Sequence, residues 1–257
     1  MAKYKSPFHL NGTLGDMKFK DGKVVMVGAS FSKKNPNQRV KENNQEFGGT
    51  AISATALLKA LSKVRESFMD KTTQNRASAI MREILQLGTG PRGERLIDLA
   101  QYKHKLLGFE LNSVDKFESI FTAPITTTVN ADRNELVIDI PDFSTINDVH
   151  ITQAVTHLKF HLALGVIGNH GFNTNNSKYH SLNDTNAAKH TLVSTVEIAI
   201  GGMVGQPTTL VAQLPDLPVL AADEVLIGAL GIEFLEFVNG QYYGFDTDKA
   251  MQIIVAE

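Results

Sequence analysis

The chain has 257 residues, of which 42% are hydrophobic and 20% charged, a balance typical of a globular protein rather than a disordered one. It contains no cysteine, which excludes disulfides and thiolate metal sites and favours a reducing compartment. The N-terminus has charges but no continuous apolar run after them, and no apolar stretch is long enough to span a bilayer. We therefore expect a cytoplasmic protein without membrane insertion.

The net charge of −2 hides a gradient along the chain. Residues 1–41 contain nine Lys/Arg and two Asp/Glu, a net charge of +7. Residues 42–121 contain eleven Lys/Arg and ten Asp/Glu, a net charge of +1. Residues 122–257 contain five Lys/Arg and fifteen Asp/Glu, a net charge of −10. Such asymmetry indicates either a basic arm for nucleic acid or an arm of one copy that contacts the acidic body of another.

Residues 1–49 are predicted to form a basic β-hairpin followed by an arm. Two β-favouring runs, 14–19 and 23–27, are separated by Asp21-Gly22, a strong hairpin signal because glycine accepts the positive φ of a primed turn. The segment 32–49 is polar, rich in asparagine and interrupted by a proline. It predicts an extended arm or an exposed loop.

Residues 50–120 are predicted to form a small helical unit. The first helix carries four apolar residues spaced by four, three and four positions, which places them on one face: Leu57, Leu61, Val64 and Phe68. Thr50 or Ser53 is the expected N-terminal cap of this helix. Second and third helices are predicted over 80–87 and 96–107.

From about residue 121 the hydrophobic period changes to two, as in residues 136–140 and 157–164. About seven strands follow with turn signals between them, among them Asn239-Gly240. Residues 121–257 are therefore predicted to form an antiparallel β-sandwich, Ig-like or jelly-roll-like, with the Asn-rich stretch 169–186 as a long loop. The fold class is α+β.

Two histidines, His157 and His161, are the first candidate metal ligands, because on a helix their spacing would place both on one face. On a strand the same spacing separates them by roughly 13 Å, too far for one ion. Their alternation with Leu158, Phe160 and Leu162 favours the strand. We therefore expect no metal site, and no cofactor motif is recognised.

The glycine-rich stretch 88–93 lacks the Lys-Ser/Thr pair of a phosphate-binding P-loop. Arg92 and Arg95 could bind an anion, but a salt bridge to Glu94 or Asp98 is the expected role. The C-terminal carboxylates have no deducible facing arrangement and are expected to be solvated at the surface: Asp216, Asp223, Glu224, Glu233 and Glu236. No serine stands in a nucleophile-elbow context, so no enzyme is predicted.

The basic N-terminal segment supplies the predicted contact residues for assembly or for an anion, because phosphates and acidic surfaces both require positive charge. These residues are Lys18, Lys20, Lys23, Lys33, Lys34, Arg39 and Lys41. Tyr4, Phe19 and Phe31 lie among them and could stack on nucleic-acid bases. No RNA-binding, helix-turn-helix or zinc-finger motif accompanies them.

Several segments together resemble an uncharacterised bacterial protein family. These are GTLGDMKF at 12–19, RVKENNQEFGG at 39–49, Arg92-Gly93, GFELN at 108–112, and GIEF at 231–234 before VNG. Members of that family pair a G-T-x-G-x-x-x-F hairpin with an R-x-x-E-N-x-x-E-F-G segment, although the hairpin here is shorter. The resemblance implies one shared architecture and a non-secreted bacterial protein. It carries no activity across.

The leading hypothesis is a structural, self-assembling protein, a subunit of an intracellular filament, tube or particle formed by head-to-tail contacts. The charge gradient, the predicted arm and the lack of a catalytic motif favour it. The alternative is a nucleic-acid- or ribosome-associated protein that uses the same basic segment, and an enzyme, sugar-directed for example, ranks third. A secreted adhesin is disfavoured because no signal sequence is recognised.

Overall fold

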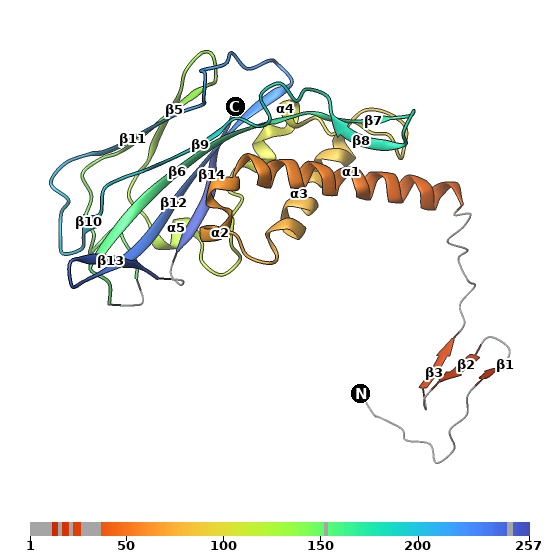
Figure 1. Cartoon of the computed structure of the whole chain (residues 1–257), viewed down its shortest axis with the longest axis horizontal. Helices are drawn as coiled ribbons and strands as arrows, with labels where there is room; N and C mark the ends of the chain where they lie inside the picture. Colours follow the sequence, from red (N-terminus) through yellow and green to blue (C-terminus); the bar gives the residue numbers. More distant parts are fainter. Residues whose placement is uncertain (1–11, 15–16, 21–22, 27–36, 152–153, 246–248) are drawn as a thin grey trace. The chain divides into compact units, whose positions relative to one another are not determined.

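The computed structural model describes residues 12–14, 17–20, 23–26, 37–151, 154–245 and 249–257 (Figure 1). It divides the chain into two compact units, Met1–Lys41 and Glu42–Glu257, called the N-terminal unit and the body below. None of the helices in the described part combines the length and apolar character needed to cross a membrane. The chain is α+β, as predicted, with an N-terminal antiparallel hairpin, few helices and a large antiparallel sheet.

The N-terminal unit contains a small antiparallel sheet in the order β1-β2-β3, made of Gly12–Leu14, Met17–Lys20 and Lys23–Met26. The pairing of β2 with β3 confirms the predicted hairpin. Its Asp21-Gly22 turn lies outside the described residues. An additional strand, β1, pairs with β2 on the other side.

Helix α1, Gln38–Ala60, starts within the predicted arm. The arm prediction is therefore wrong for residues 38–49, whereas residues 32–36 lie outside the described part. The helix begins where it does because the Asn37 side-chain oxygen accepts a hydrogen bond from the Val40 amide at 2.9 Å, a standard N-terminal cap. Thr50 and Ser53, the predicted caps, are instead buried within the helix.

Shorter helices follow α1. They are η1 (Ser62–Val64), α2 (Arg65–Phe68), α3 (Thr73–Leu87), α4 (Leu99–Tyr102), η2 (Lys103–Leu106) and α5 (Phe117–Ile120). Leu57, Leu61, Val64 and Phe68 are all buried in one core, which confirms the predicted apolar face. The face is not one continuous helix, because α1 ends at Ala60 and the chain continues through η1 and α2.

Two sheets of three or more strands form most of the β part of the body. The larger contains β6 (His157–Gly168), β9 (His190–Ser194), β10 (Ile198–Ala199), β12 (Glu224–Val238), β13 (Gln241–Gly244) and β14 (Ala250–Ala256). The smaller has the order β11-β5-β4, with bounds Thr208–Gln213, Glu135–Ile140 and Thr126–Val129. Asn239 and Gly240, at φ of 53° and 81°, form the predicted turn between β12 and β13.

The stretch 169–186 is not the long loop that its composition predicts. It contains an antiparallel pair, β7 (His170–Asn173) and β8 (Lys178–Ser181). Tyr179 on β8 is buried in the helical core, so this hairpin is held by the body rather than projecting freely.

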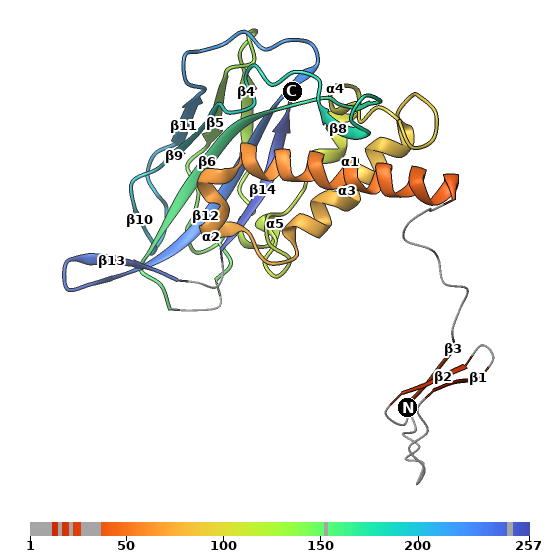
Figure 2. The same cartoon turned by 45° about the vertical axis from the view of Figure 1, so that its right-hand side comes forward.

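The body has two hydrophobic cores, one on each face of the larger sheet. Figure 2 shows α1 and α3 on one side of β6 and β12, and β5 and β11 on the other. On β6, Leu162 and Leu164 belong to the core shared with the smaller sheet, whereas Ala163 belongs to the core shared with the helices and Gly165 approaches Ala60 of α1. A Cβ atom on Gly165 would lie 2.1 Å from the carbonyl oxygen of Ala60, so glycine is needed where α1 approaches the strand. The helices and the sandwich therefore share one folded body.

Candidate functional site

The structure places the predicted basic residues on several elements. Lys18 is exposed on β2, and Arg39 and Lys41 are exposed at the start of α1. Lys20 and Lys23 lie in β2 and β3, whereas Lys33 and Lys34 lie outside the described residues. The described positions belong to the N-terminal unit, which ends at Lys41.

The structure also contains a second cationic site, which we call the arginine pocket. Sequence reasoning considered anion binding by Arg92 and Arg95 but did not bring them together with Arg82 or with the start of α1. The pocket is a cavity of about 630 Å³ in the body, between the early turns of α1, helix α3 and the turn that follows α3. Its walls are Asn43, Asn44, Glu46, Phe47, Thr50, Arg82, Leu85, Gln86, Arg92 and Arg95. Three guanidinium groups, from helix α3 and the following turn, therefore line one cavity.

The arginine pocket brings together two segments that the resemblance to the bacterial family singled out. Nη2 of Arg92 donates to the side-chain oxygen of Asn43 at 2.6 Å, and Nε of Arg92 lies 3.7 Å from the Glu42 carboxylate. Nη1 of Arg95 lies 3.8 Å from Glu46. The expected pairing of these arginines with Glu94 or Asp98 is wrong. Their partners lie on α1, about fifty positions earlier in the sequence.

The turn that carries Arg92 and Arg95 is fixed from two sides. The Gly93 amide donates to Glu46 at 2.9 Å, and the Tyr179 hydroxyl donates to the carbonyl of Arg95 at 2.9 Å. Gly93 has a φ of 93°, and a Cβ atom there would lie 3.1 Å from Cα of Glu42. The guanidinium groups therefore project from a turn whose backbone is already ordered.

Tyr179 also explains a glycine in α1. A Cβ atom on Gly49 would lie 2.6 Å from the tyrosine ring, so the ring packs directly on the helix backbone. Burial and the nearby Glu46 raise the pKa of Tyr179 well above its usual range, which keeps the hydroxyl protonated as a donor. The ring and the hydroxyl thus anchor both sides of the arginine pocket.

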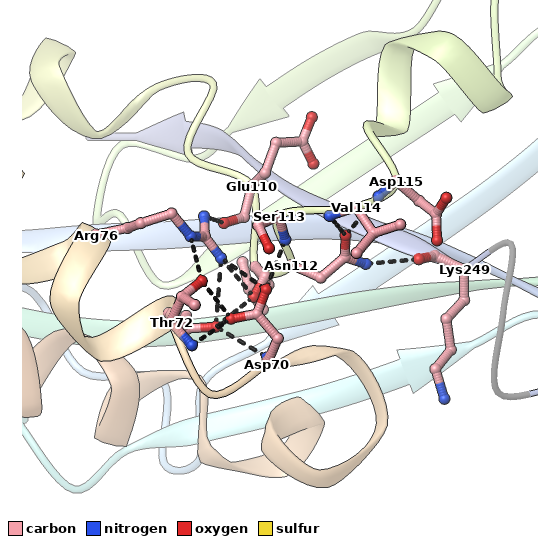
Figure 3. Close-up of polar contacts among 11 residues, drawn as sticks. Asp70, Thr72, Arg76, Glu110, Asn112, Ser113, Val114, Asp115 and Lys249 are labelled. Carbon is pink, nitrogen blue, oxygen red and sulfur yellow. Dashed lines mark hydrogen bonds and ion pairs between the residues drawn. The ribbon is translucent and has the colours of Figure 1, made fainter. Parts of the chain in front are cut away.

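A second polar cluster lies at the connection between α2 and α3 (Figure 3). The Asp70 carboxylate accepts hydrogen bonds from the amides of Thr72 and Ser113 at 2.6 and 2.7 Å. Although burial opposes its ionisation, these bonds hold the pKa of Asp70 well below its usual range. Arg76 donates to the carbonyl of Glu110 in the same cluster. These contacts join two connecting segments and have a structural role.

A third cluster joins three strands of the larger sheet. Nδ1 of His161 lies 2.7 Å from Oγ of Ser194, and Nε2 lies 2.9 Å from Oε2 of Glu233. The bond with His161 lowers the pKa of Glu233. The His161 ring also packs edge-on against Phe68. The arrangement fastens α2 to the sheet, and the described contacts supply no oxyanion-binding pair that would make it a nucleophile site.

Two of the carboxylates expected at the surface have internal partners instead. Glu224 is 1% exposed and accepts hydrogen bonds from the amide of Ala221 and from the side chain of Asn186. Glu233 is half-buried beside His161. Within the described residues, no group of three or more His, Asp or Glu side chains is arranged to hold a metal ion.

No protein-family model, no curated protein and no solved structure matches this chain. The resemblance to the uncharacterised bacterial family therefore rests on its motifs alone. The contacts between two of these motif segments in the arginine pocket are observed in the structure and do not depend on the resemblance.

Proposed function

We propose that the protein is a non-catalytic structural subunit that assembles head-to-tail inside the cell, with the N-terminal unit of one copy bound to the body of the next. The observation that carries this proposal is that the structural boundary and the charge boundary coincide. The N-terminal unit ends at Lys41, and residues 1–41 carry +7. Residues 42–257 contain sixteen Lys/Arg and twenty-five Asp/Glu, a net charge of −9.

Opposite charges on two different units favour a heterologous contact. A two-fold interface that paired like with like would bring equal charges together, whereas a head-to-tail contact pairs the basic unit with the acidic body. Repeated without closure, this contact gives a filament or tube, and with closure it gives a ring or particle.

One face of the small sheet in the N-terminal unit presents exposed apolar side chains. Leu14 and Met17 are opposite each other in the β1–β2 register, and their exposed fractions are 69% and 39%. Lys18, next along β2, points to the other face. A contact that buried these two side chains would be favourable because it removes apolar surface from water. The donor surface that we propose is therefore apolar on one side and basic on the other.

The start of α1 supports an anionic partner. Its first turn contains no acidic residue and exposes Arg39 and Lys41. A cation at a helix N-terminus opposes the helix dipole by about 0.3–1 kcal/mol. A negative surface beside these residues would offset that cost, which favours an intermolecular role for them.

The acceptor surface that we propose is the outer face of the β11-β5-β4 sheet. Leu136 and Ile138 point into the body core, so the alternating residues Glu135, Val137 and Asp139 point outward. Both charged residues among them are acidic, and Val211 beside them on β11 is 44% exposed. The face therefore offers apolar contact area with negative charge.

The position of this sheet suits a repeating contact. Figures 1 and 2 both show β11 and β5 at the end of the body opposite to the end where α1 enters it. A unit attached at one end of the body that binds the other end of the next copy generates a chain of subunits. We propose that the acceptor face binds the N-terminal unit of a second copy.

Light scattering during assembly, together with negative-stain microscopy, tests the proposal. Exposed charge pairs are screened over about 8–10 Å at physiological salt, so high salt should slow assembly. We expect Arg39→Glu/Lys41→Glu or Glu135→Lys/Asp139→Lys to slow it at least about tenfold, in line with electrostatic effects on association rates. Mixing these two variants should restore assembly in alternating contacts. Glu66→Lys, an exposed change on α2, is the control.

Two outcomes would contradict the proposal. A monomer at every salt and protein concentration would remove assembly altogether. Assembly with a rate indifferent to salt and to both charge reversals would remove the electrostatic contact.

The second candidate function is nucleic-acid or ribosome association through the same basic residues, and it is supported by the exposure of Lys18, Arg39 and Lys41. Phosphate contacts would make binding fall steeply with salt. A high ratio of absorbance at 260 to 280 nm in purified protein that forms no polymer would favour this function over assembly.

A further inference from the structure

We propose that the arginine pocket binds a small organic polyanion, a phosphate ester or a polycarboxylate, at a site independent of assembly. Arg82, Arg92 and Arg95 line the same cavity and come from α3 and from the turn that follows it. A volume of about 630 Å³ lies within the range of small-molecule sites. Guanidinium groups bind the paired oxygens of carboxylates and phosphates in a bidentate manner.

The arginines retain hydrogen-bonding capacity for a ligand. Each guanidinium has five N–H donors. Arg92 contacts Asn43 and Glu42, and Arg95 contacts Glu46 at the long distance of 3.8 Å. Arg82 is exposed and has no hydrogen bond or ion pair with any described residue. Most donors in the pocket are therefore available to an added anion.

The charge in the pocket favours an anion even with its acidic residues counted. Glu42 and Glu46 offset two of the three arginine charges, which leaves a net positive charge. Glu46 is also occupied by the Gly93 amide. Glu46 therefore holds the turn that carries Arg92 and Arg95.

The pocket is preorganised, which lowers the entropic cost of binding. The Tyr179 hydroxyl holds the turn by donating its proton to the carbonyl oxygen of Arg95 at 2.9 Å, with the carbonyl oxygen of Gly93 also 3.3 Å away, and Asn43 orients Arg92 at 2.6 Å. Phe47, 70% exposed, lies in the wall of a cavity that is otherwise mostly polar. An apolar or planar portion of the ligand would pack on this ring. The ligand class is thus an organic anion with a non-polar part.

Isothermal titration and thermal melting at low ionic strength test the site, with pyrophosphate and citrate as probes and sodium chloride of matched ionic strength as the reference. We expect saturable binding of at least one probe and a rise in Tm of roughly 2 °C or more at saturation. Binding of pyrophosphate alone identifies a phosphate ligand, and binding of citrate alone identifies a carboxylate ligand. Binding of both supports the shared oxyanion chemistry.

Arg82→Gln is the decisive variant, because this exposed residue has no described partner and its loss should not disturb folding. We expect at least a tenfold loss of affinity. Arg65→Gln, a chemically identical change on α2, is exposed and lies outside the pocket, so it should bind normally. Absence of saturable binding of both probes, or an equal loss in the two variants, would overturn the proposal. Neither result depends on whether the protein assembles.

Discussion

The two units of the chain differ in how their folds are stabilised. The body has a hydrophobic core on each face of its larger sheet. The described part of the N-terminal unit has three short strands, and Leu14 and Met17 are exposed there. Since hydrophobic burial is the main favourable term in folding, we expect the body to be stable by itself, and the contact proposed above would bury Leu14 and Met17. In the proposed assembly, the body is the scaffold and the N-terminal unit is the connector.

The largest expected effect comes from removing the connector. Deleting residues 1–41 should abolish assembly completely and lower the melting transition of the body only slightly, because the deleted part ends at the unit boundary and takes with it only the Asn37 cap and the first turn of α1. Size-exclusion chromatography and calorimetry measure the two effects. A deletion that extends to residue 49 is the comparison, since it also removes Glu42, Asn43 and Glu46, which hold the turn of the arginine pocket. That longer deletion should lower Tm further. Normal assembly of the first variant would refute the connector role.

The scaffold itself can be weakened at one position. Gly165→Ala should destabilise the body by about 3 kcal/mol, because the added Cβ would meet the carbonyl oxygen of Ala60 at 2.1 Å. Gly48→Ala is the matched control, since its Cβ meets nothing within 4 Å and alanine is the better helix former. Urea denaturation measures both. If the two variants are equally stable, the close approach of α1 to β6 is wrong.

The elements that sequence predicted best are those with a strong local signal. Strand β6 alternates between two buried faces, and the turn at Asn239-Gly240 has its own chemistry, so both could be found without knowing any partner. The start of α1 could not be found in this way. Its polar residues contact Arg92 and Gly93, which lie much later in the sequence. The spacing of hydrophobic residues does not indicate such polar contacts. The cap at Asn37 was the one local signal that marked this start.

The candidate sites show the same limit. The basic segment is visible as composition, but the arginine pocket requires knowing that the turn after α3 folds against α1. The contact of His161 with Ser194 arises from the register of β6 and β9, and that of Glu233 from the register of β12. The burial of Glu224 depends on Asn186. These groups meet through strand order and chain packing, which no local pattern encodes.

A smaller effect concerns pH. Burial raises the pKa of Glu110 to about 7, and its Oε2 is buried without a hydrogen-bond partner among the described residues. The folded pKa exceeds the ordinary value of 4.5, so the body binds this proton more tightly than the unfolded chain does. Stability from this group is present below pH 4.5 and is lost as the pH rises through 7. For a half-buried group we expect about 1–2 kcal/mol.

Urea denaturation at pH 5 and pH 8 measures this contribution. Glu110→Gln keeps an acceptor for the Phe117 amide and the Gln252 side chain but does not titrate. The variant should therefore lose less stability than the wild type between the two pH values. Parallel losses in both proteins would show that Glu110 does not titrate as described. Because Glu110 belongs to the body, its variant should assemble with the wild-type salt dependence.

The smallest effect lies where the connector meets the scaffold. Asn37→Ala removes the oxygen that accepts the Val40 amide and should cost about 1 kcal/mol of helix stability. Asn37→Asp keeps an acceptor and adds a negative charge at the helix N-terminus, so it should equal or exceed the wild type in stability. The charge makes a further distinction. If Arg39 and Lys41 bind an acidic surface, Asn37→Asp should slow assembly although it stabilises α1, whereas Asn37→Ala should slow it only through fraying of the first turn. Helix content by circular dichroism and assembly rate by light scattering separate the two effects. Equal assembly rates for the wild type and Asn37→Asp at low salt would exclude an electrostatic contact at this joint.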